Sequence, residues 1–262
     1  MKKKAIVLSV FLTVAVLLTV GCGSTTSTTA VPESTAASGL GILAKDGLGI
    51  DNSIIGVFSS AMSASGVKAS APSTPSYSGS WWHCTNSYTQ VFTYEGTTYT
   101  YSHSYDYQFR VWDDSGVEVT IPSVLDSRTS SNISKIWLYS TDTFSSNGAS
   151  STMKFGASAT EAGALKFEGY NTGTRTITGP MSFSSSYGGT SYEITLTYAS
   201  VGLNTSGWPS GSINFSVSVN GSATYAGTIT YSGGSTATIE FTTGGTGKYS
   251  VDLTTGLLTP IT

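Results

Sequence analysis

The stretch that decides the fold is Thr98–Val111, TYTYSHSYDYQFRV, in which large and polar residues alternate without interruption. Its odd-numbered positions carry Tyr, His, Phe and Val, and its even-numbered positions carry Thr, Ser, Asp, Gln and Arg. Because successive side chains of a β-strand point to opposite faces, this period of two predicts one long strand with an apolar face and a hydroxyl-rich face. Strands of this kind are typical of antiparallel sheets that bury one side and expose the other.

The same alternation returns at Tyr192–Tyr198 and four more times in the C-terminal third, where Gly-containing breaks separate the apolar sets. If every apolar set points to one side, directly opposed residues must both come from these sets. Three-residue loops at 220–222, 232–234 and 244–246 satisfy this condition, whereas a two-residue Asn-Gly turn does not. We therefore predict a four-stranded meander whose turns each contain a residue at positive φ.

In this register the meander aligns two rows of residues. The first row contains Val217, Tyr225, Phe241 and Tyr249, and the second contains Phe215, Gly227, Ile239 and Val251. The missing side chain at Gly227 is expected to leave room for a large neighbour.

Shorter strands are expected near 117–121, 132–140, 150–156, 163–170 and 174–184, in addition to a hairpin over 87–103. The total of about ten to twelve strands is large enough that the sheet must curl, close or split. The predicted fold is therefore all-β, a large antiparallel meander curled into a barrel, a half-barrel or a sandwich. The strand spacing leaves these three alternatives open.

The chain before the sheet divides into three parts. Residues 1–21 form a signal segment, and residues 22–39, which are rich in Ser, Thr and Ala, are expected to be a flexible tether. Residues 40–80 are expected to hold a short helix over 51–65, with Asp51-Asn52-Ser53 as its cap, and a linker over 69–80. The antiparallel domain then occupies residues 81–262.

The first 22 residues have the pattern of an export signal: three lysines, an apolar run over 5–20, and Gly21-Cys22. This ending resembles the lipobox of bacterial lipoproteins, although Thr19 stands where that pattern usually has Leu. The resemblance implies that Cys22 is acylated and becomes the new N-terminus. With Gly23 next, it also implies an outer-membrane lipoprotein in a Gram-negative cell. The alternative is an uncleaved anchor, for which the apolar run is short.

Composition excludes one class of partner. The signal removes three lysines, which leaves nine basic residues against fifteen acidic ones, a net charge of −6. The three arginines, Arg110, Arg128 and Arg175, are scattered along the chain. Nucleic-acid binding needs clustered Lys and Arg to neutralise phosphates, so we expect no nucleic-acid partner.

The cluster that invites a catalytic or metal interpretation is Trp81–Cys84 together with His103 and Asp106. A two-residue turn at Glu95-Gly96 would set Tyr88 opposite His103 and Cys84 opposite Tyr107. Cys84 and His103 would then lie four residues apart along the ladder, about 13 Å at the rise of a strand. That distance is too long for a thiolate–imidazole pair or a shared metal.

No other pattern supports catalysis. Asp113-Asp114-Ser115-Gly116 is typical of a turn, and it lacks the alternating acids and final Glu of a calcium loop. The chain contains no nucleophile elbow, Walker loop or zinc-protease motif, and only two histidines. We therefore expect no catalytic residues, no metal, no cofactor and no enzymatic activity.

Two tryptophans are the candidate binding residues. Trp208 follows Gly207 in a Gly/Ser-rich loop, where a large ring is hard to bury, and Trp112 falls on the polar side of its strand. Exposed aromatic rings stack on sugar faces, whereas buried ones simply fill a β core.

The sequence thus favours a lipid-anchored envelope protein that acts as a binding or structural surface module, with glycan or another envelope component as partner. The alternative is a periplasmic carrier of lipid or another amphiphile. A curled sheet with an apolar face and a helical lid resembles, in architecture alone, the half-barrel of lipoprotein-localisation factors.

Overall fold

The computed structural model describes residues 32–46, 75–94, 97–126, 132–146, 148–204 and 207–261. Within them lie two helices, α2 (Glu33–Asp46) and α4 (Pro122–Asp126), and thirteen strands. The strands are β1 (Ser76–Ser78), β2 (Trp81–Tyr94), β3 (Thr97–Asp113), β4 (Ile133–Ser146), β5 (Ala149–Phe155), β6 (Leu165–Glu168), β7 (Thr174–Tyr187), β8 (Thr190–Asn204), β9 (Ser210–Val219), β10 (Ser222–Ser232), β11 (Thr236–Thr243), β12 (Lys248–Asp252) and β13 (Leu258–Pro260).

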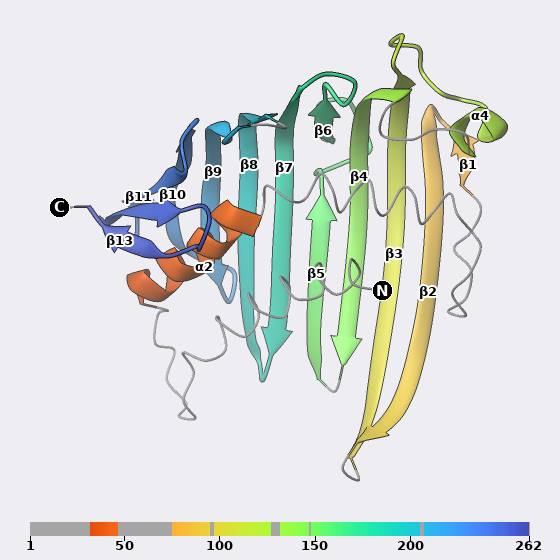
Figure 1. The fold of residues 1–262 in the computed structure, drawn as a ribbon. Helices are drawn as coiled ribbons and strands as arrows, with labels where there is room; N and C mark the ends of the chain where they lie inside the picture. The colour runs from red at the N-terminus through yellow and green to blue at the C-terminus, as the bar shows by residue number, and fades with distance from the viewer. Residues whose placement is uncertain are drawn as a thin grey trace.

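All thirteen strands form one antiparallel sheet that follows the chain from β1 to β13, with β5 and β6 sharing the space between β4 and β7. The edges β1 and β13 do not pair with each other, so the sheet is not a closed barrel. Figure 1 shows β11 and β13 running at a steep angle to β2–β8, with α2 lying against this end of the sheet. The open, curled meander confirms the predicted fold class.

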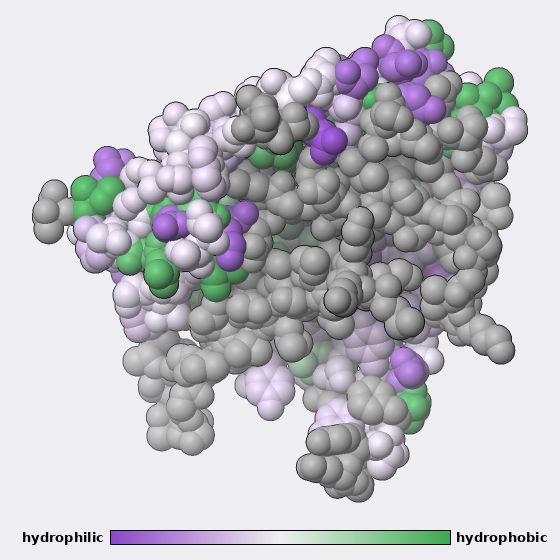
Figure 2. All heavy atoms as spheres, in the orientation of Figure 1, coloured by the Kyte–Doolittle hydropathy of each residue, from purple (hydrophilic) through white to green (hydrophobic). Residues whose placement is uncertain are grey.

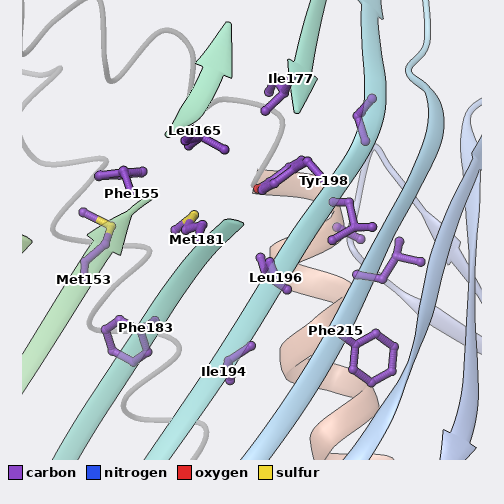
Figure 3. Packing of buried hydrophobic residues seen from close by; sticks show 14 of the residues in the cluster. Met153, Phe155, Leu165, Ile177, Met181, Phe183, Ile194, Leu196, Tyr198 and Phe215 are labelled. Atoms are coloured by element: carbon purple, nitrogen blue, oxygen red, sulfur yellow. The ribbon is translucent and has the colours of Figure 1, made fainter. Parts of the chain in front are cut away.

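The alternation seen in Thr98–Val111 holds across the sheet. One face carries the buried core, to which β5–β9 contribute Met153, Phe155, Leu165, Ile177, Met181, Phe183, Ile194, Leu196, Tyr198 and Phe215. Figure 3 shows these side chains as one layer on the strands. We call this side the apolar face and the opposite side, which carries the Ser and Thr residues, the hydroxyl face. Helix α2 packs on the apolar face, because its buried residues belong to the same core.

The expected strands near 132–140, 150–156, 163–170 and 174–184 are all present as β4, β5, β6 and β7. The expected strand at 117–121 is wrong, because this segment makes only an isolated bridge between Glu118 and Trp112. The bridge lies just beyond the Trp82–Phe109 pair, so β2 already occupies the edge of β3 along which a longer strand over 117–121 would continue.

The register predicted for the first hairpin is confirmed. Tyr88 pairs with His103, and Cys84 pairs with Tyr107. Cys84 and His103 are thus four residues apart along the ladder, as the two-residue connection requires.

The first turn of the C-terminal meander differs from the prediction. Val219 pairs directly with Ser222, so the turn has two residues, Asn220 and Gly221, both at positive φ. A bulge between Ala223 and Tyr225 then absorbs one residue and restores the expected pairing of Val217 with Tyr225. One extra residue on a single strand resets the register. A two-residue turn followed by a bulge therefore gives the same pairing as the predicted three-residue loop.

The next two turns also differ, by two residues in register. Gly227 pairs with Phe241 and not with Ile239, and Ile239 pairs with Tyr249 and not with Val251. A shift of two keeps every side chain on its predicted face, since faces repeat with that period. The face assignment is therefore right, whereas the rows of directly opposed residues are wrong beyond β10.

Gly227 does make room for a large neighbour, as expected. A Cβ atom built there would collide with the Glu240 carbonyl oxygen and lie 2.7 Å from Cζ of Phe215. The ring of Phe215 instead meets that of Phe241 edge-on, with their centroids 5.4 Å apart.

Helix α2 is held at both ends by tyrosines of the sheet. Near its start, the Glu33 carboxylate accepts a hydrogen bond of 2.8 Å from the Tyr249 hydroxyl. Near its end, the Tyr231 hydroxyl donates to the Ala44 carbonyl at 2.9 Å, which is one of the carbonyls that a helix cannot satisfy internally. Leu40 is buried between these ends, and small residues let the helix approach the strands closely.

The prediction of a flexible tether over 22–39 is wrong for residues 33–39, which form the first half of α2. Ala36 and Ala37 bury little area each, so composition alone does not predict a helix here, yet both are buried in the docked helix. Tertiary packing, more than local propensity, stabilises such a helix.

Two other expectations concern segments that the structure describes only in part. The helix predicted over 51–65 lies outside the described residues. Of the linker predicted over 69–80, residues 76–78 form β1 and residues 79–80 the turn into β2.

The Tyr231 hydroxyl should stabilise the docked helix measurably. Tyr231→Phe leaves the Ala44 carbonyl without its donor, and we expect the free energy of unfolding to fall by about 1–3 kcal/mol. The matched control is Tyr198→Phe, because the Tyr198 hydroxyl is buried on the same face and has no hydrogen-bond partner among the described residues. That change should leave stability unchanged or slightly raised. Urea denaturation followed by circular dichroism measures both changes. An equal loss of stability in the two variants would contradict the role of the Tyr231 hydroxyl.

Candidate functional site

The hydroxyl face carries Ser and Thr residues in rows that cross many strands. One row consists of Thr89, Ser102, Ser145, Ser150, Ser186 and Ser191, from β2 to β8. The next consists of Ser87, Ser104, Thr143, Thr152 and Ser184. At the other end of the sheet a row consists of Ser212, Thr230, Thr238, Ser250 and Thr259. None of these residues is fully buried, and none is charged.

Neighbouring hydroxyls within the rows hydrogen-bond to one another. Thr89 Oγ1 and Ser102 Oγ are 3.0 Å apart, and Ser150 Oγ and Ser186 Oγ are 2.9 Å apart. Each hydroxyl is both a donor and an acceptor, so it retains capacity for an external partner. Strand spacing of about 4.8 Å makes the rows a regular lattice of polar groups.

Trp112 lies on the same face but is not an open platform. Its ring is 7% exposed and packs against Trp137, with the centroids 4.6 Å apart. Arg110 Cζ lies 4.8 Å from the Trp112 ring centroid, and Lys135 Nζ lies 4.3 Å from it. Lys166 Nζ stands 4.7 Å from the Trp137 centroid. The expectation that Trp112 is available to stack on a sugar is therefore wrong.

The physical reason is that tryptophans and cations alternate on adjacent strands. Arg110 pairs with Trp137 across β3 and β4, and Trp112 pairs with Lys135. Positive charges are attracted to the faces of indole rings, so the neighbouring Arg and Lys side chains lie over each ring and cover it. Glu118 receives a 2.8 Å hydrogen bond from Arg110 Nε, and this interaction raises the pKa of Arg110.

Trp208, the second candidate, is exposed as expected, with 43% of its surface accessible. It lies in the connection between β8 and β9, directly before Pro209. The Pro209 carbonyl accepts a 2.9 Å hydrogen bond from Gly233 N, which places this connection beside the β10–β11 turn. Trp208 is therefore an apolar group at one end of the sheet.

The apolar face holds a polar cluster that the sequence analysis did not identify. Asp142 is only 5% exposed, and its Oδ2 accepts a 2.7 Å hydrogen bond from the Tyr107 hydroxyl. Its Oδ1 lies 3.5 Å from Nε2 of His103, and neither of these two atoms has a hydrogen-bond partner among the described residues. The His103 ring stacks on Phe144, with a centroid distance of 4.2 Å.

A signal for Asp142 was present in the sequence. It shares parity with Leu138 and Phe144 within Ile133–Ser146, so alternation alone puts this carboxylate on the apolar face. The His103 ring occupies the place of an aromatic side chain on this face, stacked on Phe144.

The cluster does not assemble known catalytic chemistry. Ser140 is fully buried and pairs with Tyr107, whereas His103 pairs with Phe144, four residues further along β4. The described residues contain no group of three or more His, Cys, Asp and Glu side chains that could hold a metal. His83 faces the other side of the sheet, where its Nε2 lies 2.8 Å from Asp106 Oδ1.

The acidic loop after β3 has the chemistry of a turn. Asp113 Oδ1 accepts hydrogen bonds from the backbone N–H groups of Ser115, at 3.0 Å, and Val117, at 2.8 Å. Gly116 occupies the positive φ that the turn requires. These contacts use the carboxylate to close the loop, as the sequence predicted.

Comparisons with protein-family models, with curated proteins and with solved structures find no match to this chain. In the part of the chain that the structure describes, no helix has both the length and the hydrophobicity needed to cross a bilayer.

The buried tyrosines predict a loss of stability at alkaline pH. Burial, followed by the nearby Cys84 thiol, raises the pKa of Tyr105 to about 12, and burial together with Asp142 raises the pKa of Tyr107. In the unfolded chain a tyrosine ionises near pH 10. The stability that these groups contribute is therefore complete below pH 10 and lost as the pH rises toward 12.

Urea denaturation at pH 9 to 12 should show this decline, and Tyr105→Phe should make it shallower. A stability that stays constant up to pH 12, or a decline that is identical in the variant, would contradict the assignment.

Proposed function

We propose that this protein is a lipid-anchored envelope module that contacts neutral glycan through its hydroxyl face. The observation that carries the proposal is the lattice of uncharged Ser and Thr rows across the sheet. A polysaccharide also presents closely spaced hydroxyls that donate and accept, so the two surfaces are chemically complementary without any charge. Trp208 adds an exposed ring of the kind that stacks on sugars.

The energetics require an extended ligand. A single hydrogen bond that replaces one to water contributes only about 0.5–1.5 kcal/mol. A monosaccharide would touch few rows and bind weakly, whereas a polymer engages many contacts at high effective concentration. Because the rows carry no charge, binding should depend little on salt.

A second candidate function is the carriage of lipid or another amphiphile. It is favoured by the apolar face, where Asp142 Oδ1 and His103 Nε2 lack hydrogen-bond partners among the described residues. A polar headgroup placed there would supply a partner, with its chain against the neighbouring apolar side chains. The hydroxyl face has no role in this alternative, which makes the two proposals separable.

Glycan contact is tested by co-sedimentation with insoluble neutral polysaccharide, such as cellulose or chitin particles. Ser104→Lys with Ser150→Lys puts two charges into adjacent rows, and we expect the affinity to fall about tenfold, equal to about 1.4 kcal/mol. The control is Ser115→Lys with Ser123→Lys, which makes the same charge change at exposed hydroxyls outside the rows. The control should bind as the wild type does. If glycan binding changes the tryptophan fluorescence of the wild type, Trp208→Phe should reduce that change.

Absence of wild-type binding to every neutral glycan tested, or full binding by the face variant, would refute glycan contact.

The anchor is tested by mass spectrometry of protein purified from membranes. The expected mass corresponds to a chain that begins at Cys22 and carries acyl groups. Cys22→Ala should abolish this form, whereas Cys84→Ser, which changes the buried cysteine, should preserve it. An unmodified Cys22 or an uncleaved chain would overturn the anchor.

The same sample under native conditions should carry a second, non-covalent amphiphile only if the carrier alternative holds.

A further inference from the structure

The two edges of the sheet are very different. The outer strand β13 has three residues and ends in Pro260, which has no N–H to donate. Helix α2 packs beside it, and a Cβ atom placed on Gly41 of the helix would lie 3.3 Å from Cγ of Leu258. A short strand and a proline are two of the devices by which proteins block an edge. This edge is blocked.

The other edge is long, and among the described residues only the short strand β1 pairs with it. Strand β2 has fourteen residues, and β1 pairs only with Trp81–His83. The end of β2, YTQVFTY over 88–94, contains no charge, no proline and no glycine. It is rich in Thr, Tyr, Val and Phe, which favour strands.

The alternation of the ladder shows which backbone groups face outward. Tyr94 and Thr97 close the β2–β3 hairpin across two residues, so they form a hydrogen-bonded pair. In an antiparallel ladder such pairs alternate with pairs whose N–H and C=O groups point away from each other. The N–H and C=O groups of Thr89, Val91 and Thr93 therefore point to the outer edge. The side chain of Val91 is 62% exposed, which is unusual for a valine on this hydroxyl-rich face.

The asymmetry between the edges restricts how two copies could join. Pairing of β2 with the β13 edge of another copy would build filaments, but the blocked β13 edge prevents this pairing. Pairing of β2 with β2 joins identical edges, so it must be two-fold symmetric and antiparallel, and it terminates at two copies.

We propose that two copies of this chain dimerise by antiparallel pairing of their β2 edges, with the two-fold axis at Val91. This register sets Val91 against Val91 of the second copy and Thr89 against Thr93, so it uses the three residues that point outward. Each hydrogen-bonded pair exchanges two bonds, which gives about six backbone hydrogen bonds across the axis. The two Val91 side chains would cover each other, and no like charges would meet.

The proposal does not depend on glycan binding. Dimerisation would nevertheless join the Ser and Thr rows of two copies into one continuous hydroxyl face, because paired edges keep each face on its own side. A polymer bound across both copies would then gain avidity.

The first test is sedimentation velocity of the full-length chain in a non-ionic detergent over a range of concentrations. The wild type should sediment as a dimer, and Val91→Lys should be monomeric because two ammonium groups would meet at the axis. The matched control is Val117→Lys, since Val117 is also 62% exposed but lies in the loop after β3. It should remain dimeric. A wild-type monomer at every concentration, or a Val91→Lys dimer, would overturn the proposal.

The second test fixes the register. Paired Cα atoms in such a ladder lie about 5.5 Å apart, within the range of a disulfide. Val91→Cys should therefore cross-link to itself when diamide is added as the oxidant. Thr89→Cys should not, because it lies opposite Thr93 and about 13 Å along the strand from its own copy. The wild type, with Cys22 and Cys84, gives the background. Equal cross-linking of both variants would refute the axis at Val91, and circular dichroism confirms that each variant is folded.

Discussion

The constraint on which this structure depends is the strict alternation of side chains along each strand. Thr98–Val111 becomes β3 because its period of two puts every large residue on one face. Antiparallel neighbours with the same period must match that face, so the whole sheet acquires one apolar side and one hydroxylic side. The core, the docking of α2 and the Ser and Thr rows are all consequences of this division.

The same division explains why polar and aromatic exceptions matter. Asp142 lies on the apolar face, where Tyr107 provides a hydrogen bond that a buried carboxylate needs. Trp112 lies on the hydroxyl face, where Arg110 and Lys135 enclose it. In both cases the misplaced group also needs a partner from an adjacent strand, Tyr107 for Asp142 and Lys135 for Trp112, and the pattern of a single strand does not display such partners.

The proposed function depends on a surface and not on a catalytic centre. The hydroxyl face offers many weak, uncharged contacts, which suit a polymer, and the proposed β2 dimer would extend this face. Of the predicted site residues, Trp208 is exposed as the loop composition indicated. Trp112 is buried. The alternation of its strand predicts its face correctly but does not predict its neighbours on the adjacent strand.

The sequence by itself determined the fold class, the faces of the strands and the first hairpin register, since these depend on local period and turn length. It did not determine the meander rows beyond β10, because the connections after β10 and β11 differ from the predicted turns and shift the register by two residues, which changes no face. Nor did it reveal α2, whose alanines bury little area until Tyr231 and Tyr249 hold the helix against the sheet. Those contacts join residues about two hundred positions apart, and only the tertiary structure brings them together.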